Sequence, residues 1–202
     1  MKIVTVTGYK GGVGKSTTAI HLATYFSELG KTLLVDGDLN RTSIAWAERG
    51  QFPFEVVNQL KAMKAIAGKD YVIIDTPARP DSDELNQLAE GCDLLVLPTT
   101  PDVVSLEPMM QTALDLGKKT AYRVLITIVP PYPNREGELM KKELLEADVP
   151  VFNTLIRRTT GFQRAAVEGV PIRDLKNSDM RKAWQDYKAL GKEVQGVWDE
   201  RL

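Results

Sequence analysis

Short runs of apolar residues alternate with longer amphipathic segments along the chain. The runs are rich in Val, Ile and Leu, and most of them end at a polar residue, Gly or Pro. Continuous apolar runs are typical of strands that are buried on both faces, and their alternation with helices predicts a mostly parallel sheet. The predicted strands are Ile3 to Thr7, Thr32 to Asp36, Tyr71 to Asp75, Leu94 to Pro98 and Val124 to Val129, with weaker ones near Phe54 to Val57 and Val151 to Thr154.

Helical segments fill the intervals between these strands. Glycines stand where helix C-caps are expected, at Gly30, Gly68, Gly91 and Gly117. The pattern indicates an α/β fold, with a twisted, mostly parallel sheet and helices on both faces. The sequence contains no linker or internal repeat, so we expect residues 1–202 to form one domain. The predicted helices are Lys15 to Leu29, Ser43 to Arg49, Gln59 to Ala67, Asp83 to Glu90, Val104 to Leu116, Glu136 to Glu146, Phe162 to Val167 and Asp179 to Trp198.

Composition narrows the class of protein. The chain has 202 residues, 43% of them apolar and 26% charged, which excludes disorder and suits one buried core. The single cysteine, Cys92, excludes an internal disulfide and a cysteine-based zinc site. The single histidine, His21, falls inside a predicted helix, so we expect a structural role rather than a Ser-His-Asp triad. No apolar run is long enough to span a membrane or resembles a signal peptide, so we expect a cytoplasmic protein.

A glycine-rich segment joins the first predicted strand to the first predicted helix. It reads Gly8-Tyr9-Lys10-Gly11-Gly12-Val13-Gly14-Lys15-Ser16-Thr17. Glycines let successive backbone N–H groups turn onto phosphate oxygens, Lys15 supplies a cation for the β and γ phosphates, and the Ser16 hydroxyl is a Mg²⁺ ligand. Tyr9 replaces the usual first glycine. The segment nevertheless predicts a P-loop NTPase fold that binds ATP and Mg²⁺.

Lys10 adds a second lysine to this loop. The run Lys10-Gly11-Gly12-Val13-Gly14-Lys15-Ser16-Thr17 resembles the deviant Walker A box of the ParA/MinD family of ATPases, and the resemblance extends from Met1 to about Leu190. In that family the loop lysine crosses a dimer interface to the phosphates that the partner subunit binds. The resemblance therefore implies a homodimer with ATP sandwiched between its subunits, in which Lys10 and Lys15 are catalytic.

Two acidic segments match the same family in the same order. Val35-Asp36-Gly37-Asp38 resembles switch I, and Ile73-Ile74-Asp75-Thr76-Pro77 resembles Walker B with switch II. The resemblance implies that Asp38 positions the attacking water, Asp36 supports the metal and water shell, and Asp75 holds Mg²⁺ through a water. Taken singly, each aspartate also fits a helix N-cap or a turn. Leu39-Asn40 replace the family's common Pro-Gln, which predicts a switch I that moves or couples to partners differently.

Later segments carry weaker signals. Leu97-Pro98-Thr99-Thr100-Pro101-Asp102 resembles a family loop in which Pro101 lines the interface. Adenine contacts are assigned by position only, to Pro130, Pro131 and the stretch Ile172 to Leu175.

Basic residues cluster late in the chain. Nine basic and four acidic residues lie between Arg157 and Lys192, whereas the whole chain has a net charge of -1. This cluster predicts binding of double-stranded DNA without sequence preference, as the ATP-bound dimers of the family do; a solvated helix face is the alternative. The candidate contacts are Arg157, Arg158, Lys176, Arg181, Lys182 and Lys188.

The end of the sequence argues against direct membrane binding. MinD-like relatives end in a basic amphipathic helix, whereas the last ten residues here, Glu193 to Leu202, hold three acidic residues and one basic. Anionic lipid does not attract such a segment.

The resemblance is strongest to small plasmid-type ParA proteins, including ParF-like and carboxysome-positioning McdA-like members. It implies a slow ATPase that a small adaptor protein stimulates, that associates with the nucleoid when ATP-bound, and that positions cargo such as a plasmid, chromosome or carboxysome. Two alternatives stay open. One is a metabolic P-loop ligase or kinase, which Lys10 and the late basic cluster disfavour. The other is a structural polymer that ATP locks.

Overall fold

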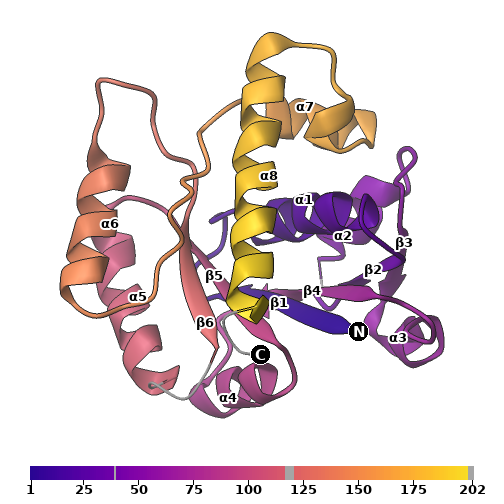
Figure 1. Ribbon diagram of the computed structural model, residues 1–202, viewed down its shortest axis with the longest axis horizontal. Coiled ribbons are helices and arrows are strands. Elements are labelled where there is room, and N and C mark those ends of the chain that lie inside the picture. The colour runs from indigo at the N-terminus through magenta and orange to yellow at the C-terminus, as the bar shows by residue number, and fades with distance from the viewer. Residues whose placement is uncertain (39, 117–120, 200–202) are drawn as a thin grey trace.

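The computed structural model describes residues 1–38, 40–116 and 121–199. Its centre is a six-stranded, all-parallel sheet in the order β3-β2-β4-β1-β5-β6 (Figure 1). This confirms the predicted α/β class with a parallel sheet. The strands are β1 (Lys2–Gly8), β2 (Thr32–Asp36), β3 (Glu55–Asn58), β4 (Tyr71–Ala78), β5 (Leu94–Thr99) and β6 (Tyr122–Ile126).

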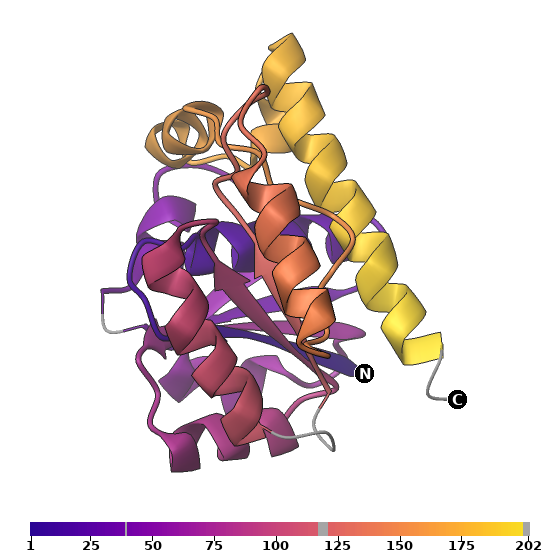
Figure 2. The ribbon, with the colours of Figure 1, turned by 90° about the vertical axis from the view of Figure 1, so that its left-hand side faces the viewer.

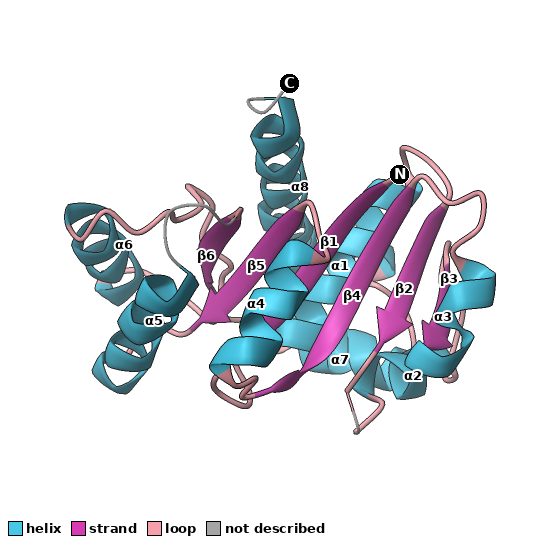
Figure 3. Cartoon of the chain, turned by 90° about the horizontal axis from the view of Figure 1, so that it is seen from below, coloured by secondary structure: helices cyan, strands magenta, loops and turns pink. Residues whose placement is uncertain are grey.

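Helices cover both faces of the sheet, because every crossover between parallel strands must pass over one face. Helices α3 and α4 lie on the face that Figure 3 turns toward the viewer, and α1 lies behind the sheet. Helices α5 and α8 lie on opposite sides of the sheet (Figure 2). The helices are α1 (Lys15–Ser27), α2 (Thr42–Ala47), α3 (Gln59–Ala65), α4 (Ser82–Glu90), α5 (Val103–Leu116), α6 (Glu136–Glu146), α7 (Gly161–Glu168) and α8 (Ser178–Asp199), with the 3₁₀ turn η1 (Ile172–Asp174).

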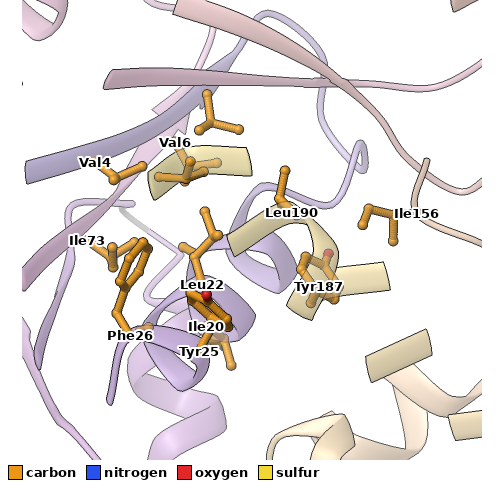
Figure 4. Packing of buried hydrophobic residues seen from close by; sticks show 14 of the residues in the cluster. Val4, Val6, Ile20, Leu22, Tyr25, Phe26, Ile73, Ile156, Tyr187 and Leu190 are labelled. Carbon is orange, nitrogen blue, oxygen red and sulfur yellow. The ribbon is translucent and has the colours of Figure 1, made fainter. Parts of the chain in front are cut away.

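The apolar strands divide their side chains between the two faces of the sheet. Leu34 of β2 packs with α1 and α8, whereas its neighbours Leu33 and Val35 pack beneath α3. This alternation follows from the pleat, which points successive side chains to opposite faces. Figure 4 shows the α1 side, where Phe26 lies beside Ile73 of β4 and Tyr187 lies between Leu190 of α8 and Ile156. Both faces of the central strands are therefore buried, as the continuous apolar runs predicted.

The predictions for the last strands were partly wrong. β6 ends at Ile126 rather than at Val129, because Ile128 has a positive φ of 54° that extended backbone cannot accommodate. Val151 makes one isolated bridge to Val124, and the predicted strand from Val151 to Thr154 does not form. Phe152 N still donates to Val124 O, but the amides of Asn153 and Thr154 turn away from the sheet and donate to the Glu193 carboxylate of α8.

One of the predicted C-cap glycines is the cap residue itself, and two others lie two residues beyond the caps Glu28 and Ile66. Gly91 is the C-cap of α4, and the amide of Gly30 donates to Phe26 O in the last turn of α1. Gly68 has φ 72° two residues beyond the cap of α3. Gly117 lies outside the described residues, as do Leu39 of the predicted switch I and residues 200–202 of the C-terminal segment. Among the described residues, no helix has the length and apolar character needed to cross a membrane.

Candidate functional site

The glycine-rich loop lies between β1 and α1 at the carboxyl edge of the sheet. Gly12 and Gly14 have φ of 78° and 84°, a left-handed conformation that glycine adopts without strain. Gly14 is the N-cap of α1 and provides no side chain that caps the helix. The first backbone N–H groups of this 13-residue helix are therefore available to an anion, and the helix dipole favours negative charge there.

Lys15 is buried at the start of α1 and lies near two carboxylates. Its Nζ donates to the carbonyl of Lys10, 3.4 Å away, across the inside of the loop. Burial lowers the pKa of Lys15, and the charges of Asp75 and Asp38 act in the opposite direction. A buried ammonium inside a ring of backbone donors suits binding of a phosphate group.

The buried carboxylate of Asp75 has the surroundings expected of a metal-binding group. It is fully buried in β4, and Ser43 Oγ donates to its Oδ2 at 2.8 Å, but its Oδ1 has no hydrogen-bond partner among the described residues. Burial raises the pKa of Asp75 to about 6, against the opposing effect of the Ser16 and Ser43 hydroxyls beside it. A buried carboxylate oxygen without a donor, next to the Ser16 hydroxyl, fits a Mg²⁺ ion that takes oxygen ligands.

The described residues contain no group of three or more His, Cys, Asp or Glu that is arranged to hold a metal. A Mg²⁺ site of the nucleotide type does not require such a group. Such a site uses one or two protein oxygens together with phosphate oxygens and water, and it needs no all-protein cage.

The two aspartates at the end of β2 have different surroundings. Asp36 is buried, and both of its carboxylate oxygens accept backbone hydrogen bonds, from Asp38 N at 3.0 Å and Ile44 N at 2.9 Å. Burial raises the pKa of Asp36, while those amides act against the rise. Asp38 is half-buried and accepts from the amide and side chain of Asn40. Asp36 thus holds the loop in shape, and Asp38 stands closer to solvent.

A cavity of about 880 Å³ opens beside the phosphate loop. Gly12, Gly14, Thr17 and Pro131 are among its lining residues, and the assignment of Pro131 to adenine stays a prediction. Ile172 and Leu175, which the sequence also suggested, are buried in the core instead. The other lining residues are Thr127, Ile128, residues 156–160, Phe162, Gln163 and Tyr187. The cavity is large enough for a nucleoside.

Lys10 is exposed on the outer side of the loop. Its Nζ lies 2.9 Å from Ser105 Oγ and 3.3 Å from Asp102 Oδ1, both at the start of α5. Pro101, one residue before, is buried.

The six candidate DNA contacts do not form one group. Arg157 makes a bidentate ion pair with Asp186 at 2.6 and 2.7 Å, and both Arg157 and Arg158 line the cavity beside the phosphate loop. The other four lie away from this cavity, and Lys182 pairs with Asp179 at 3.4 Å. Lys176, Arg181 and Lys188 make no ion pair within the described ranges.

Three residues of the site were not predicted from the sequence. Ser43 binds Asp75 from α2, and Thr127 Oγ1 lies 2.8 Å from Val13 O, where it ties the loop to the end of β6. Arg157 lines the cavity although it was assigned to a DNA face. The only sequence signal for the first two is that each hydroxyl follows a strand end.

Comparison with known proteins identifies the family. The model of the CobQ/CobB/MinD/ParA nucleotide binding domain matches residues 4–172. A protein of Gloeobacter kilaueensis named maintenance of carboxysome distribution protein A is 34% identical over 206 residues, which cover 98% of this chain and 95% of that protein.

Two solved structures share the fold. Apo McdA of Cyanothece superposes with a TM-score of 0.71 at 17% identity, covering 94% of this chain and 99% of that one. A plasmid partition protein of Borrelia burgdorferi bound to AMPPNP has a TM-score of 0.70 at 19% identity and covers 100% and 99% of the two chains. Together with the extent of the family match, these similarities show that the chain belongs to the CobQ/CobB/MinD/ParA family and is a ParA/MinD-type ATPase.

Proposed function

We propose that the protein is an ATP-driven switch, formed by residues 1–202 as one nucleotide-binding domain, that pairs with a second copy when ATP is bound and separates after hydrolysis. The observation that carries this proposal is Lys10. It stands on the phosphate loop but points outward, while Lys15 already occupies the inside. A second exposed lysine on such a loop is suited to phosphates held by another subunit.

The residues divide the work of hydrolysis between binding and positioning. Gly11 to Thr17 and the start of α1 bind the phosphates, and Lys15 neutralises their charge as it develops. Asp38, half-buried and close enough to Lys15 to influence its pKa, orients the attacking water. Asp36 fixes the loop that carries Asp38 through two backbone hydrogen bonds.

Ser16 would hold Mg²⁺ directly, Asp75 would hold it through a water, and Asp36 would support the outer shell of ligands. When bound, the ion neutralises charge on the phosphate oxygens. Ser43 fixes the carboxylate of Asp75 so that its other oxygen faces this site.

The switch acts on cargo. The relative named for carboxysome distribution and the solved plasmid partition protein support a role in positioning a carboxysome or a plasmid. We propose that the ATP-bound dimer attaches to double-stranded DNA of the nucleoid in the cytoplasm, and that a small adaptor protein on the cargo stimulates hydrolysis. The candidate DNA contacts are now Arg158, Lys176, Arg181 and Lys188. Arg157 is not among them, because its guanidinium forms a bidentate ion pair with Asp186.

Three single variants test the nucleotide switch. Lys10→Ala should bind one ATP per chain but stay monomeric, Asp38→Ala should accumulate as an ATP-bound dimer with little turnover, and Lys15→Ala should lose nucleotide. Sedimentation with a slowly hydrolysed ATP analogue and a phosphate-release assay measure these outcomes.

Lys142→Ala, on the exposed face of α6, is the matched control for removal of one lysine. A dimer of unchanged affinity in the Lys10→Ala protein would refute the proposal that this lysine acts across an interface. Turnover at the wild-type rate in Asp38→Ala would remove Asp38 from the catalytic residues.

A further inference from the structure

We propose that Asp102 and Ser105 are positioning residues that hold Lys10 in the single subunit, so that the subunit must release this lysine before it can reach a second copy of the chain. The inference rests on the proposed dimerisation. It adds that Asp102 and Ser105 within each subunit compete for Lys10 with the phosphates of the second subunit, and this competition sets how readily the dimer forms.

The contacts around Lys10 use the full hydrogen-bonding capacity of its ammonium group. Nζ lies 2.9 Å from Ser105 Oγ, 3.3 Å from Asp102 Oδ1 and 3.4 Å from Asp102 Oδ2. A lysine ammonium has three donors, and three oxygens surround it here. The same ammonium therefore cannot bind phosphate oxygens in another subunit without leaving these partners.

The holding site is already formed by contacts that do not involve Lys10. Asp102 Oδ1 accepts from Ser105 N at 3.0 Å and thereby caps the first turn of α5, and Thr100 Oγ1 donates to Oδ2 at 2.5 Å. Burial acts to raise the pKa of Asp102, but the hydrogen bonds from Thr100, Ser105 and Lys10 hold that pKa below its ordinary value. The hydrogen bonds from Thr100 and Ser105 N, which do not involve Lys10, therefore fix the carboxylate in place before the lysine docks.

Asp102 and Ser105 lie next to the phosphate loop, at the edge of the sheet where the nucleotide binds. The phosphate loop follows β1, and the segment with Asp102 follows β5, which pairs with β1 in the sheet. Both segments therefore meet at the carboxyl edge, where the nucleotide binds. The Lys10 side chain is 48% exposed even while held, so its release requires no opening of the core.

The exposure of the Lys10–Asp102 ion pair determines how much its loss should change the dimerisation constant. An exposed ion pair with good hydrogen bonds contributes at most about 1 kcal/mol, which is about a fivefold change in an equilibrium constant. Two lysines leave their sites when one dimer forms. Loss of the holding site should therefore strengthen dimerisation by about 25-fold, provided that nucleotide binding itself is unchanged.

The first experiment measures whether Lys10 is held, and it needs no dimer. Nucleotide-free protein is treated briefly with an amine-acylating reagent, and the labelling of each lysine is quantified by mass spectrometry. Asp102→Asn keeps a helix-capping side chain but removes the charge, and Ser105→Ala removes the shortest contact without changing net charge. In both variants the labelling rate of Lys10 should rise severalfold, while the labelling of Lys142 stays unchanged.

Glu146→Gln is the matched control, because it removes the charge from another exposed pair, with Lys142. It should raise labelling of Lys142 slightly and leave Lys10 as in the wild type. Thermal melting of all variants checks that they are folded. Unchanged labelling of Lys10 in both site variants would overturn the inference.

The second experiment measures dimerisation by sedimentation with a slowly hydrolysed ATP analogue. Asp102→Asn should dimerise about 25-fold more tightly than the wild type, and Ser105→Ala should change in the same direction by a smaller factor. If Glu146→Gln strengthens dimerisation as much as Asp102→Asn does while Ser105→Ala leaves it unchanged, a general effect of charge explains Asp102→Asn and the competition is refuted. If the wild type does not dimerise at all, the proposed function fails and the competition with it, whereas the labelling result still decides whether Lys10 is held.

Discussion

At the scale of single residues, His21 shows how a polar side chain is accommodated in the core. The ring is fully buried on α1 and stacks on Tyr187 with a centroid distance of 4.7 Å. Ile172 N donates to its Nε2 at 3.0 Å, so the proton lies on Nδ1, which donates to Thr17 O at 2.6 Å. The neutral ring thus joins α1, η1 and α8, and a second proton would remove the acceptor for Ile172. The structural role expected for this histidine agrees with these contacts.

Burial lowers the pKa of His21 to about 4. Because an unfolded histidine titrates near 6.5, this group stabilises the fold above that pH, and its contribution is lost as pH falls from about 6.5 to about 4. The expected loss is about 3 kcal/mol. His21→Asn, which does not titrate, should be less stable than the wild type at pH 7.5, and the difference in free energy of unfolding should narrow toward pH 4.

Urea denaturation from pH 7.5 to pH 4 measures this difference. Comparison of the two proteins is necessary, because the raised pKa of Asp75 gives both a slope of opposite sign: a buried carboxylate with a pKa of about 6 destabilises the fold as pH rises. That slope cancels in the difference. A gap that stays constant across the series would mean that His21 does not titrate differently in the folded and unfolded protein.

At the scale of elements, the sequence predicts most strands and helices, because their signals are local. The phosphate loop is an example, because its glycines, its lysine and the start of the helical pattern that follows all stand within about ten residues. The stretch Val151 to Thr154 has strand propensity too, and Phe152 N donates to Val124 O of β6, but the two later amides bind a helix some 40 positions further along the chain. Asn153 N and Thr154 N donate to the carboxylate of Glu193 at 2.7 and 2.8 Å. A local sequence pattern cannot show that a distant carboxylate will bind amides that could otherwise pair in a sheet.

The same reasoning explains which parts of the site were predicted. Lys15, Asp36, Asp38 and Asp75 follow from strand ends and from the family resemblance, and the structure brings them to one edge of the sheet. The contact of Ser43 with Asp75 joins segments 32 residues apart in sequence and depends on how α2 returns to the sheet. Such contacts are properties of the tertiary structure.

Glu193 should therefore stabilise the fold measurably. Its carboxylate accepts from two backbone amides and from Thr154 Oγ1 at 2.6 Å, and thereby fastens α8 to the segment after α6. Glu193→Ala leaves these donors without their charged acceptor, which costs about 2 kcal/mol. Chemical denaturation should show this loss, whereas Glu146→Ala on exposed α6 should lie within about 0.5 kcal/mol of the wild type. Equal effects of the two variants would contradict the assigned role.

At the scale of the whole molecule, positive charge is concentrated on one face of α8. Arg181, Lys188 and Lys192 are 7 and 4 residues apart, a spacing that puts them on the same side of a helix over about 16 Å. Within the described ranges none of the three makes an ion pair. The net charge of the chain is only -1, so in the proposed DNA binding this stripe and its copy in a dimer would contribute a local, sequence-independent attraction, together with Arg158 and Lys176.

Attachment to DNA should depend on both nucleotide and salt. The ATP-bound dimer presents two stripes and should bind double-stranded DNA more tightly than the ADP-bound or nucleotide-free chain, because two weak contacts on one duplex add avidity. Each phosphate contact releases counterions, so the log-log slope of affinity against salt should be about -0.9 per contact. Replacing Arg181, Lys188 and Lys192 by Ala should make the slope shallower and leave ATP binding intact, whereas replacing Lys64, Arg135 and Lys142 should change it little.

Fluorescence anisotropy across a salt series, with ATP, ADP and no nucleotide, measures both dependences. Equal affinity in all three nucleotide states would mean that ATP does not control attachment, and equal slopes for the two triple variants would move the DNA contact away from α8.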